Sequence, residues 1–487
     1  MLHSAPARGD RLPAQERLDI HLVAIGGTGM APLACLLARA GHRVRGSDGP
    51  LYPPMSTLLE RAGITPLVGY DAAHLEPRPD LVVIGNAVRR DNPEAVATEG
   101  SGIPRLSMPE ALARFFLAGR RPLVVAGTHG KTTTTALAAW VLAHAGRDPG
   151  FLVGGVPVDL GASFRRGGGE RFVVEGDEYN AAYFDRGAKF LHYRAETVLL
   201  TSVEYDHADL YPDPESLRAA YRQLVGALPP GGALVACGDS EEVRAVAREA
   251  RCEVIFYGAR SDNDVRFAAP PVATPAGASF EVVERGGARQ AVRLGVWGEH
   301  NAGNALAVWA AARRDGLEPG AVAAALARFR GVARRQELLA EAGGIAVVDD
   351  FAHHPTAVAK TIAALAGRFP GRRLLVCFEP RSLTAGRAFF LDGYRAAFRA
   401  AGAVLLAPLF HRDRLAEADR LDLGELAADL ARAGTPAAAC ASIDELAQRA
   451  LEWARPGDVV VTMSSGSFAG LPQRLAAALH RRPLTPA

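Results

Sequence analysis

A short glycine-rich segment, Gly127-Thr128-His129-Gly130-Lys131-Thr132, has the residue types and the spacing to bind a phosphate chain. Between a strand and a helix, such a turn presents backbone N–H groups to phosphate, and the helix dipole adds positive potential at the same point. Lys131 would reach the terminal phosphates, and the Thr132 hydroxyl would ligate Mg²⁺. The usual phosphate loop has a further glycine where this chain has Val125. The segment therefore predicts a nucleotide site of a shortened G-x-x-G-K-T form.

Two groups of polar residues follow the next two buried strands. Glu175, Asp177 and Glu178 follow one strand, and Glu204, Asp206, His207 and Asp209 follow the other. Parallel strands deliver their carboxyl ends to one crevice, so both groups should lie beside the loop. Oxygen donors suit Mg²⁺, and a neutral imidazole can supply a further ligand. We expect metal ligands here, above all Glu175 and His207, with a solvated loop charge as the alternative for each residue.

These side chains need a scaffold, and the chain supplies apolar runs that alternate with amphipathic stretches. This pattern is typical of strands and helices laid down as parallel α/β units. Strands are expected at residues 21–25, up to 48, 80–84, 123–126, 171–174, 197–200, 345–348, 373–376, 403–406 and 459–461, and helices from Thr132 and near Asn301. Boundaries near residue 120 and at 331–336 divide the chain into a disordered leader, 1–18, and segments 19–120, 121–330 and 331–487.

Length and composition limit what the loop can belong to. At 487 residues the chain is too long for one ordinary core, so several domains are expected. A hydrophobic content of 49% and a charged content of 22% are those of a soluble globular protein. The net charge of +2 gives no general reason to expect a nucleic acid or a membrane partner.

Targeting signals and cysteine motifs are also missing from the sequence. The first eighteen residues lack an apolar core, and no apolar run approaches the roughly 18 residues of a membrane span. The five cysteines are scattered and form no C-x-x-C pair, which argues against a zinc site or a redox motif. A cytoplasmic enzyme fits these observations best.

Four segments, in this order, resemble the Mur ligase family: Gly127 to Thr135, Glu175-Gly176-Asp177-Glu178, Asp206-His207 and His300-Asn301-Ala302-Gly303-Asn304-Ala305. The resemblance runs over nearly the whole chain. It implies an α/β fold of three domains: a Rossmann-like N-terminal domain for a UDP-sugar, a central phosphate-loop ATPase, and a Rossmann-like C-terminal domain that binds an amine. It also implies an ATP-dependent ligase of peptidoglycan metabolism that makes an amide through an acyl phosphate.

The resemblance implies roles for individual residues. Lys131, Glu175, His207 and Arg335 are the expected catalytic residues, and Thr132, Glu175 and His207 are the expected Mg²⁺ ligands. The expected ATP-binding residues are Gly127, Thr128, His129, Gly130, Lys131, Thr132, Thr133, Asn301 at the adenine, Asn304, Arg335, and Asp350 at the ribose. Cations spread around the transferring phosphoryl group are the main catalytic device of such reactions. The third segment should close onto the ATP, because Arg335 and Asp350 belong to it.

One departure from the family pattern narrows the choice. Several members carry a carbamylated lysine shortly after the metal-ligating histidine, where this chain has Arg222. Arginine cannot be carbamylated in that way. The resemblance therefore points to the muramate-binding branch, whose members lack this lysine.

Within that branch two substrates compete for the amine site. Addition of the tripeptide L-alanyl-γ-D-glutamyl-meso-diaminopimelate, recovered from old cell wall, is favoured by residues 176–185 and by Glu379-Pro380-Arg381-Ser382. Gly85-Asn86-Ala87 and residues 463–468 favour it as well. Addition of L-alanine is favoured by residues 25–30, which resemble the alanine-adding enzymes. We prefer the tripeptide and keep L-alanine as the alternative.

Substrate-binding residues are expected on both outer domains. For UDP-N-acetylmuramate the resemblance implies Gly27, Thr28, Gly29, Met30, Asp48 and Asn86. For the amine it implies His353, although a histidine just before Pro355 would equally cap the next helix. Arg381 suits a peptide carboxylate, with a surface salt bridge as the equal alternative. The sequence leaves the oligomeric state open between a monomer and a dimer.

Two functions from other classes remain. A nucleotide-gated binding protein without turnover would have no need of Lys131, Glu175, His207 and Arg335 together. An NAD-linked oxidoreductase would bind its cofactor at Gly27 and Gly29, which half match a dinucleotide fingerprint. That function leaves the phosphate loop and its acidic neighbours without a purpose.

Overall fold

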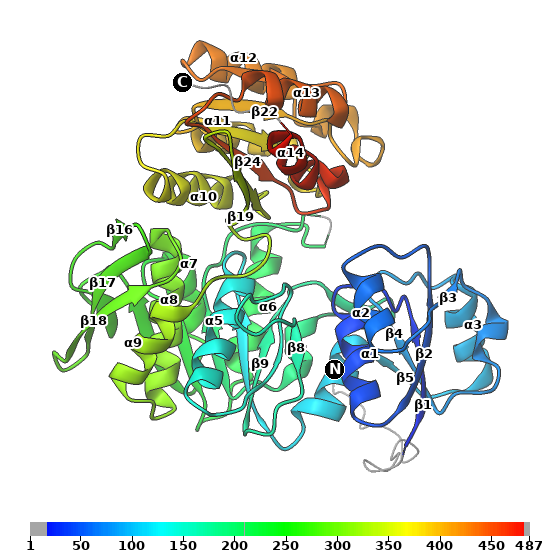
Figure 1. Ribbon diagram of the computed structural model, residues 1–487. Helices are drawn as coiled ribbons and strands as arrows, with labels where there is room; N and C mark the ends of the chain where they lie inside the picture. The colour runs from blue at the N-terminus through cyan, green and yellow to red at the C-terminus, as the bar shows by residue number, and fades with distance from the viewer. Residues whose placement is uncertain (1–16, 209, 482–487) are drawn as a thin grey trace.

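The computed structural model describes residues 17–208 and 210–481, and the described chain folds into three α/β bodies (Figure 1). The C-terminal body lies above the central body in this view, and the N-terminal body lies beside the central one. Most of the expected leader, together with Asp209, lies outside the described residues. Leu18, the last residue assigned to the leader, is buried in the N-terminal body.

The N-terminal body is a parallel sheet with the strand order β3-β2-β1-β4-β5, covered by short helices. Its elements are β1 Asp19–Val23, α1 Met30–Arg39, β2 Arg43–Asp48, α2 Met55–Arg61, β3 Leu67–Val68, β4 Leu81–Ile84, α3 Pro93–Ser101, β5 Arg105–Ser107 and α4 Met108–Leu112. This order is that of the first five strands of a Rossmann fold, as expected. The side chains of Asn92 and Ser107 cap α3 and α4, which fixes where these helices begin.

The central body is built on a sheet whose middle is parallel, in the order β15-β14-β13-β12-β6-β9-β7. Its elements up to the middle of the sheet are β6 Arg121–Ala126, α5 Lys131–His144, β7 Gly150–Leu152, β8 Phe164–Arg165, β9 Arg171–Glu175, β10 Asn180–Ala182, β11 Asp185–Ala188, β12 Thr197–Leu200, α6 Pro214–Gly226, β13 Ala233–Cys237, α7 Glu241–Ala247, β14 Glu253–Gly258 and β15 Val265–Phe267. All parallel strands of this sheet end on the side that carries the phosphate loop.

Beyond β15 the central sheet turns antiparallel, and here the expectation of parallel units throughout the chain was wrong. The remaining elements are β16 Val272–Thr274, β17 Gly277–Glu284, β18 Arg289–Leu294, α8 Glu299–Arg314 and α9 Pro319–Arg328. β17 pairs antiparallel with β15, β16 and β18. The connections β16–β17 and β17–β18 are too short for the crossover helix that a parallel pair requires, so hairpins form instead.

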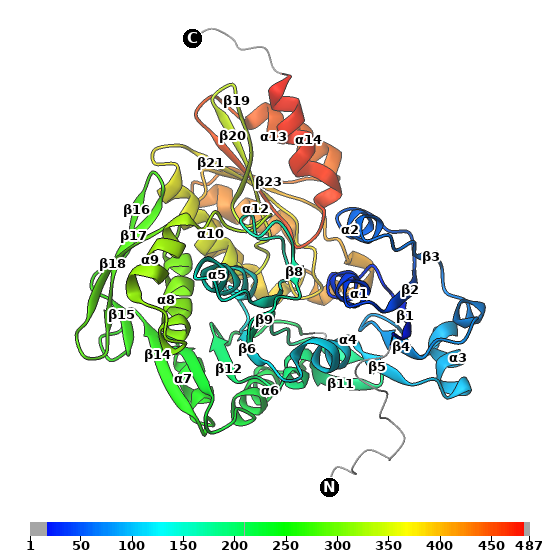
Figure 2. The ribbon, with the colours of Figure 1, turned by 60° about the horizontal axis from the view of Figure 1, so that its bottom comes forward.

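Helices cover both faces of the central sheet (Figure 2). Alternate residues of β6 point to opposite faces: Val124 and Ala126 pack with residues of α6 and α7, whereas Leu123 and Val125 pack with α5, α8 and α9. The first of these cores continues into the N-terminal body, since it also contains residues of α1. The central and N-terminal bodies therefore share apolar packing.

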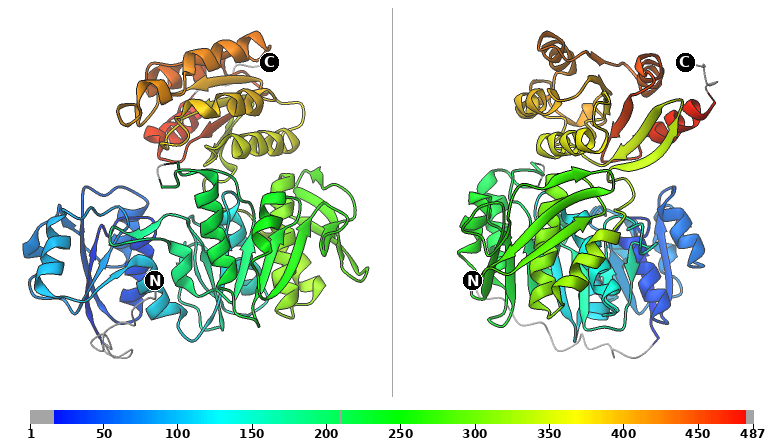
Figure 3. Two further views of the ribbon diagram at one scale, coloured as in Figure 1. Left: turned by 180° about the vertical axis from the view of Figure 1, so that it is seen from behind. Right: turned by 60° about the vertical axis from the view of Figure 1, so that its left-hand side comes forward.

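The C-terminal body is a second parallel sheet in the order β20-β24-β21-β22-β23, with β19 antiparallel at one edge. Its elements are β19 Glu337–Ala342, β20 Ile345–Asp350, α10 Pro355–Arg368, β21 Leu374–Phe378, α11 Leu391–Phe398, β22 Ala403–Leu406, α12 Leu423–Arg432, β23 Ala437–Ala439, α13 Ile443–Trp453, β24 Val459–Met463 and α14 Leu471–His480. Apolar clusters cover both faces of this sheet. The segment after α9 carries the chain from the central body into this one (Figure 3).

Two sequence expectations can be checked on the described residues. Within residues 17–208 and 210–481, no helix combines the length and the apolar character needed to span a bilayer. All five cysteines are free thiols; Cys35, Cys377 and Cys440 are buried, and Cys237 and Cys252 are half-buried.

The three sheets described above, each with its covering helices, confirm the predicted α/β fold of three parts.

Candidate active site

The phosphate loop follows β6 directly and runs into α5. Gly127 and Gly130 both have positive φ angles, +128° and +81°. A Cβ on Gly127 would lie 2.3 Å from the Thr201 Oγ1, so a larger residue does not fit the turn. The Thr201 hydroxyl donates to the His129 carbonyl at 2.5 Å, and Ser202 Oγ accepts from the His129 amide at 2.9 Å. The end of β12 thus holds the loop in shape.

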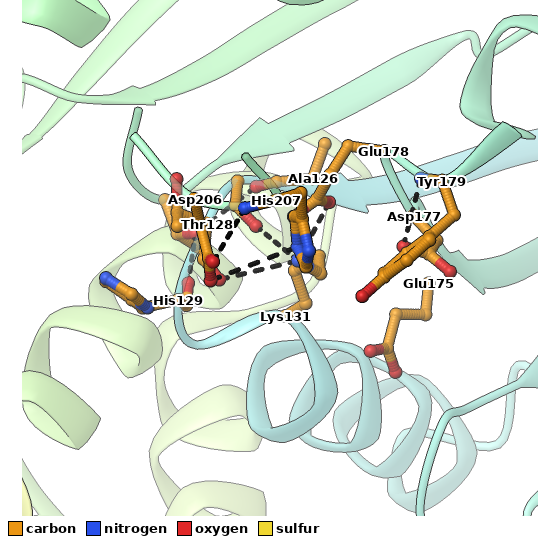
Figure 4. Close-up of polar contacts among 12 residues, drawn as sticks. Ala126, Thr128, His129, Lys131, Glu175, Asp177, Glu178, Tyr179, Asp206 and His207 are labelled. Carbon is orange, nitrogen blue, oxygen red and sulfur yellow. Dashed lines mark hydrogen bonds and ion pairs between the residues drawn. The ribbon is translucent and has the colours of Figure 1, made fainter. Parts of the chain in front are cut away.

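Lys131 and His207 share one buried carboxylate, that of Glu178 (Figure 4). Lys131 Nζ lies 2.9 and 3.0 Å from the two Glu178 oxygens, and His207 Nε2 lies 2.9 Å from Oε1. Burial alone would lower the pKa of Lys131, but Glu178 and Asp177 outweigh it and raise that pKa. Burial likewise opposes the charged form of His207, and the hydrogen bond and charge of Glu178 raise its pKa. The three side chains form one hydrogen-bonded cluster at the mouth of the phosphate loop.

Glu175 belongs to a different set of contacts on the other side of the loop. Its Oε1 accepts from the Thr132 hydroxyl at 2.9 Å, and its Oε2 accepts from the Gly154 amide at 2.7 Å. Arg335 donates to the same Thr132 hydroxyl at 3.1 Å and stacks over the Phe351 ring at 4.6 Å. The predicted residues Thr132, Glu175 and Arg335 are thus in direct contact, whereas His207 bonds to Glu178 rather than to Glu175.

The remaining acidic residue of the first group is also paired. Lys189 Nζ lies 2.9 Å from Asp177 Oδ2, and its ammonium faces the Tyr179 ring at 5.6 Å. Burial raises the pKa of Asp177, but the charges of Lys189 and Lys131 outweigh it and lower that pKa. Asp177 is therefore a carboxylate held against the cluster. Arg222, at the place of the family's lysine, pairs with Glu215 on α6.

A cavity of about 610 Å³ opens from the loop between the central and C-terminal bodies. His129, Gly130 and Thr133 line it at the loop, Asn301 and Asn304 line it from α8, and Arg335, Asp350 and Lys360 line it from the C-terminal side. All but Lys360 are residues predicted at the nucleotide. The cavity therefore has the loop at one end and α8 and α10 along its length.

Several groups in this cavity are fixed by hydrogen bonds. Asn301 Nδ2 donates to the Trp297 carbonyl at 2.7 Å, and Asn304 Nδ2 donates to Asn301 Oδ1 at 3.2 Å. The Asp350 carboxylate accepts from the backbone amides of Gln336 and Ala352, both at 2.8 Å. Burial lowers the pKa of His300, next to Asn301, to about 4. That imidazole is neutral at pH 7.

On the amine side, two adjacent histidines have different surroundings. His353 Nδ1 lies 3.1 Å from the Phe351 carbonyl, and burial lowers its pKa. His354 caps α10, since its Nδ1 accepts from the Thr356 amide at 3.3 Å. The expectation that a histidine before proline caps the helix is thus confirmed for His354. His353 has no such structural task and stays the candidate amine ligand.

Arg381 follows β21 and is held among C-terminal loops. Its guanidinium lies 3.5 Å from the buried Glu379 carboxylate and 3.8 Å from the centre of the Phe410 ring. A Cβ on Gly466 would overlap the same guanidinium, so the small residue leaves room for it. The partner carboxylate is buried, which makes this pair more than the surface salt bridge considered from the sequence.

The N-terminal loop Gly27-Thr28-Gly29-Met30 joins β1 to α1, with Gly29 as the N-cap residue of the helix. The Asp48 Oδ2 accepts from the Gly26 amide at 2.7 Å, which ties the end of β2 to this loop. Asn86 is exposed just after β4, next in the sheet to β1. These residues therefore gather at the carboxyl end of the N-terminal sheet, away from the loop at Gly127.

The structure shows contacts of three residues that the sequence did not resolve. Glu178 and Glu204 were counted among the possible metal ligands, with a solvated loop charge as the alternative. In the structure Glu178 joins Lys131 to His207. Glu204 joins His129 to Thr356 of the C-terminal body. Lys360 lines the nucleotide cavity. The chain has only three lysines, Lys131, Lys189 and Lys360, and this rarity was the one signal for Lys360 in the sequence.

Three family models match the chain in succession. The models described as Mur ligase family, catalytic domain, as Mur ligase middle domain and as Mur ligase, glutamate ligase domain cover residues 19–120, 125–312 and 334–466. Their limits follow the three bodies.

Curated relatives carry two different names. The chain is 39% identical over 472 residues to the UDP-N-acetylmuramate–L-alanyl-γ-D-glutamyl-meso-2,6-diaminoheptandioate ligase of Escherichia coli (strain K12), covering 96% of this chain and 99% of that protein. It is 40% identical over 392 residues to the UDP-N-acetylmuramate–L-alanine ligase of Kineococcus radiotolerans, covering 80% of this chain and 81% of that protein.

Solved structures show the same two names. A murein peptide ligase from Psychrobacter arcticus 273-4 is 33% identical and superposes with a TM-score of 0.72, covering 96% of this chain and 99% of that one. A UDP-N-acetylmuramate–alanine ligase from Thermotoga maritima, at 24% identity, has a TM-score of 0.78 and covers 95% and 99%. The latter similarity concerns the fold alone.

Proposed function

Because this chain belongs to the Mur ligase family, we propose that it joins UDP-N-acetylmuramate to the tripeptide L-alanyl-γ-D-glutamyl-meso-diaminopimelate at the expense of ATP. The observation that carries this proposal is the 39% identity to the Escherichia coli ligase of that name over 96% of the chain. The same-named enzyme of Haemophilus influenzae is 35% identical over 94% of the chain. Amide formation on a muramate of recycled peptidoglycan is thus the proposed reaction.

Three domains would divide this work. Residues 19–120 would bind UDP-N-acetylmuramate at Gly27, Thr28, Gly29, Met30, Asp48 and Asn86. Residues 121–330 would bind ATP, and residues 331–487 would bind the amine. The order of the three matched family models supports these boundaries. A cytoplasmic location stays a prediction from the sequence, as does the choice between a monomer and a dimer.

The cavity and the phosphate loop suit ATP from end to end. The loop amides and Lys131 would hold the phosphates, Asn301 would contact the adenine, and Asp350 would hold the ribose. Asp350 is fixed by two backbone amides, so its free lone pairs point to a defined place. Thr132 and Glu175 offer oxygen donors in contact with each other, which fits Mg²⁺, and His207 would complete the set. The ion would neutralise the charge of the phosphates.

In the first half-reaction the muramate carboxylate would attack the γ-phosphorus of ATP, the bond to the bridging oxygen would break, and the products would be an acyl phosphate and ADP. Lys131 and Arg335 flank the point where negative charge develops, since both lie within hydrogen-bond reach of groups on the loop. For Lys131 to bind phosphate, its ion pair with Glu178 must loosen. Glu178 would then keep His207 oriented through the hydrogen bond to Nε2.

In the second half-reaction the peptide amine would attack the acyl carbon and release phosphate. His353 is uncharged at neutral pH, so its imidazole can accept a hydrogen bond from the amine. Arg381 would pair with a carboxylate of the glutamyl or diaminopimelyl residue, in a fork geometry that lysine lacks. His353 follows β20 and Arg381 follows β21, so a peptide that contacts both would lie across the carboxyl ends of β20, β24 and β21.

A competition between amines tests the substrate. Purified protein receives ATP, Mg²⁺ and UDP-N-acetylmuramate with either the tripeptide or L-alanine, and products are identified by mass. We expect faster ligation of the tripeptide. Faster ligation of L-alanine would instead establish the second candidate, which the similarity to the Kineococcus radiotolerans ligase favours. Absence of phosphate release with every amine would leave only a nucleotide-binding protein without turnover.

A further inference from the structure

The loop after β12 lies between the phosphate loop and the C-terminal body, and Glu204 is its central residue. The Glu204 amide donates to Thr128 Oγ1 at 2.8 Å, and the Thr128 hydroxyl donates back to the Glu204 carbonyl at 2.9 Å. These reciprocal bonds fix the Glu204 backbone to the phosphate loop. Any movement of one segment is therefore passed to the other.

The Glu204 side chain extends this connection to the C-terminal body. Its Oε2 lies 3.2 Å from His129 Nε2 in the phosphate loop and accepts from the Thr356 hydroxyl of α10 at 2.7 Å. His354 Nδ1 is 4.0 Å from the same oxygen, and the His129 and His354 rings are 4.6 Å apart. One carboxylate oxygen thus joins the phosphate loop to the first turn of α10.

The charge state of Glu204 suits this task. Burial raises the pKa of the carboxyl group, but hydrogen bonds from His129 and Thr356 outweigh it and lower that pKa to about 2. The group is a carboxylate at any physiological pH and accepts from donors on both bodies. The ligand atoms of His129, Glu204 and His354 lie within 4.8 Å of one another, a spacing that could also hold a metal ion. However, Glu204 Oε2 already accepts from the Thr356 hydroxyl, and His354 Nδ1 accepts from the Thr356 amide. We therefore interpret the cluster as a junction between the central and C-terminal bodies.

Each end of this junction is close in sequence to residues proposed to act in one of the two half-reactions. Lys131 and Thr132 follow His129 in the loop, and His353 immediately precedes His354. The His353 carbonyl is itself held by the Tyr394 hydroxyl at 2.7 Å. A second hydrogen bond between the same loop and the C-terminal body runs from the Ala208 amide to Thr384 Oγ1 at 3.2 Å. The path through Glu204 therefore connects the phosphoryl-binding residues to the amine-binding ones.

We propose that Glu204 is a positioning residue that keeps the amine-binding end of α10 in register with the phosphate loop while the amine attacks the acyl phosphate. This inference depends on the proposed function of the site. It assigns Glu204 to the second half-reaction, because its side chain reaches the first turn of α10 and Glu204 does not itself line the cavity where ATP would bind, although its partner His129 does. A displacement of about 1 Å between reacting groups costs on the order of 10²-fold in rate.

Two assays separate the half-reactions. Label exchange from ADP into ATP, in the presence of UDP-N-acetylmuramate and without amine, reports reversible acyl-phosphate formation. Amide formation with the tripeptide reports both halves. For Glu204→Ala and for the near-isosteric Thr356→Val we expect amide formation to fall by about 10- to 100-fold, while exchange changes by less than about threefold.

Further variants tie the effect to the Glu204–Thr356 bond. The double variant should be no slower than Glu204→Ala alone, since both changes remove one contact. Glu204→Gln keeps an acceptor for the Thr356 hydroxyl and should recover most of the rate. Glu452→Ala, an exposed carboxylate on α13, should leave both assays unchanged.

The outcomes are distinct. Equal losses of exchange and amide formation in Glu204→Ala would mean that the residue only shapes the phosphate loop and would overturn the proposal. An unchanged rate in Thr356→Val would overturn it too, even if the Glu204 variants misfold. Absence of exchange in the unmodified protein would instead refute the proposed function itself.

Discussion

Replacing Arg335 by lysine is expected to slow phosphoryl transfer by about 10³- to 10⁵-fold while the fold stays intact, the loss typical of a guanidinium that stabilises a transferring phosphoryl group. In the structure the Arg335 guanidinium donates a hydrogen bond to the Thr132 hydroxyl and stacks on Phe351. Losing these contacts would cost about 1–2 kcal/mol of stability, since lysine keeps the charge. The rate should therefore suffer far more than the stability.

The neighbouring Arg334 offers a matched control, for which we expect a larger loss of stability and a smaller loss of rate. Its guanidinium lies 3.1 Å from the buried Asp349 carboxylate, donates to the Ser464 carbonyl at 2.9 Å, and also donates to the Gly466 carbonyl. A lysine retains one such bond at best, so Arg334→Lys should destabilise the protein by about 2–4 kcal/mol. It faces none of the phosphate-loop residues, and its effect on the rate should stay within about tenfold.

Urea unfolding measures the stability of both variants, and single-turnover ADP formation measures their rate of phosphoryl transfer. We expect the two effects to separate: a large loss of rate with a small loss of stability for Arg335→Lys, and the reverse for Arg334→Lys. If Arg335→Lys keeps a tenth or more of the rate, the guanidinium is not a transition-state ligand. If Arg334→Lys is the slower enzyme at unchanged stability, the two assignments are interchanged.

Three further changes address the loop, the α10 cap and the amine site. Gly127→Ala places a Cβ 2.8 Å from the Ser202 backbone at a φ of +128°, so we expect about 1–3 kcal/mol of strain in the loop. Calorimetry should then detect no nucleotide binding, and an unchanged affinity would contradict the loop geometry. Burial lowers the pKa of His354 to about 4, so the native state stays unprotonated while the unfolded chain binds a proton below pH 6.5. As the pH is lowered from 6.5 to 4, the free energy of unfolding should therefore fall by up to about 1.4 kcal/mol per pH unit. His354→Asn, which keeps a cap, should reduce this slope in urea unfolding, and identical slopes in the two proteins would contradict the assignment to His354. Arg381→Ala should raise KM for the tripeptide by about 10- to 100-fold and leave KM for ATP unchanged, and an unaltered tripeptide KM would exclude the carboxylate contact.

The parallel cores of the fold could be predicted because their strands are buried on both faces. Leu81–Ile84 and residues 459–461 are continuous apolar runs between helical stretches, a pattern typical of strands buried in a parallel sheet. The antiparallel extension from β15 to β18 was missed. Its strands alternate polar and apolar residues, as in Arg289–Leu294, and its pairing depends on short hairpins that a coarse pattern does not locate.

Within the site, the sequence could identify the loop but not the partners of each carboxylate. Glu175 ends β9 and Glu178 follows it, and only the fold shows that Glu175 contacts Thr132 while Glu178 contacts Lys131 and His207. Glu204 was also indistinguishable from a solvated loop charge, because its partner Thr356 lies 152 residues away in the chain. Contacts between bodies leave no trace in local spacing.

The distribution of lysine gives this enzyme a built-in probe of its own occupancy. Lys131 and Lys189 are ion-paired with side chains only 13% and 12% exposed, whereas Lys360 is exposed and borders the nucleotide cavity. Apart from the α-amino group, an acylating reagent should therefore modify Lys360 first. A bound nucleotide would shield that amine, so the extent of labelling, read from one peptide by mass spectrometry, would report how much of the enzyme carries its nucleotide, without any engineered tag.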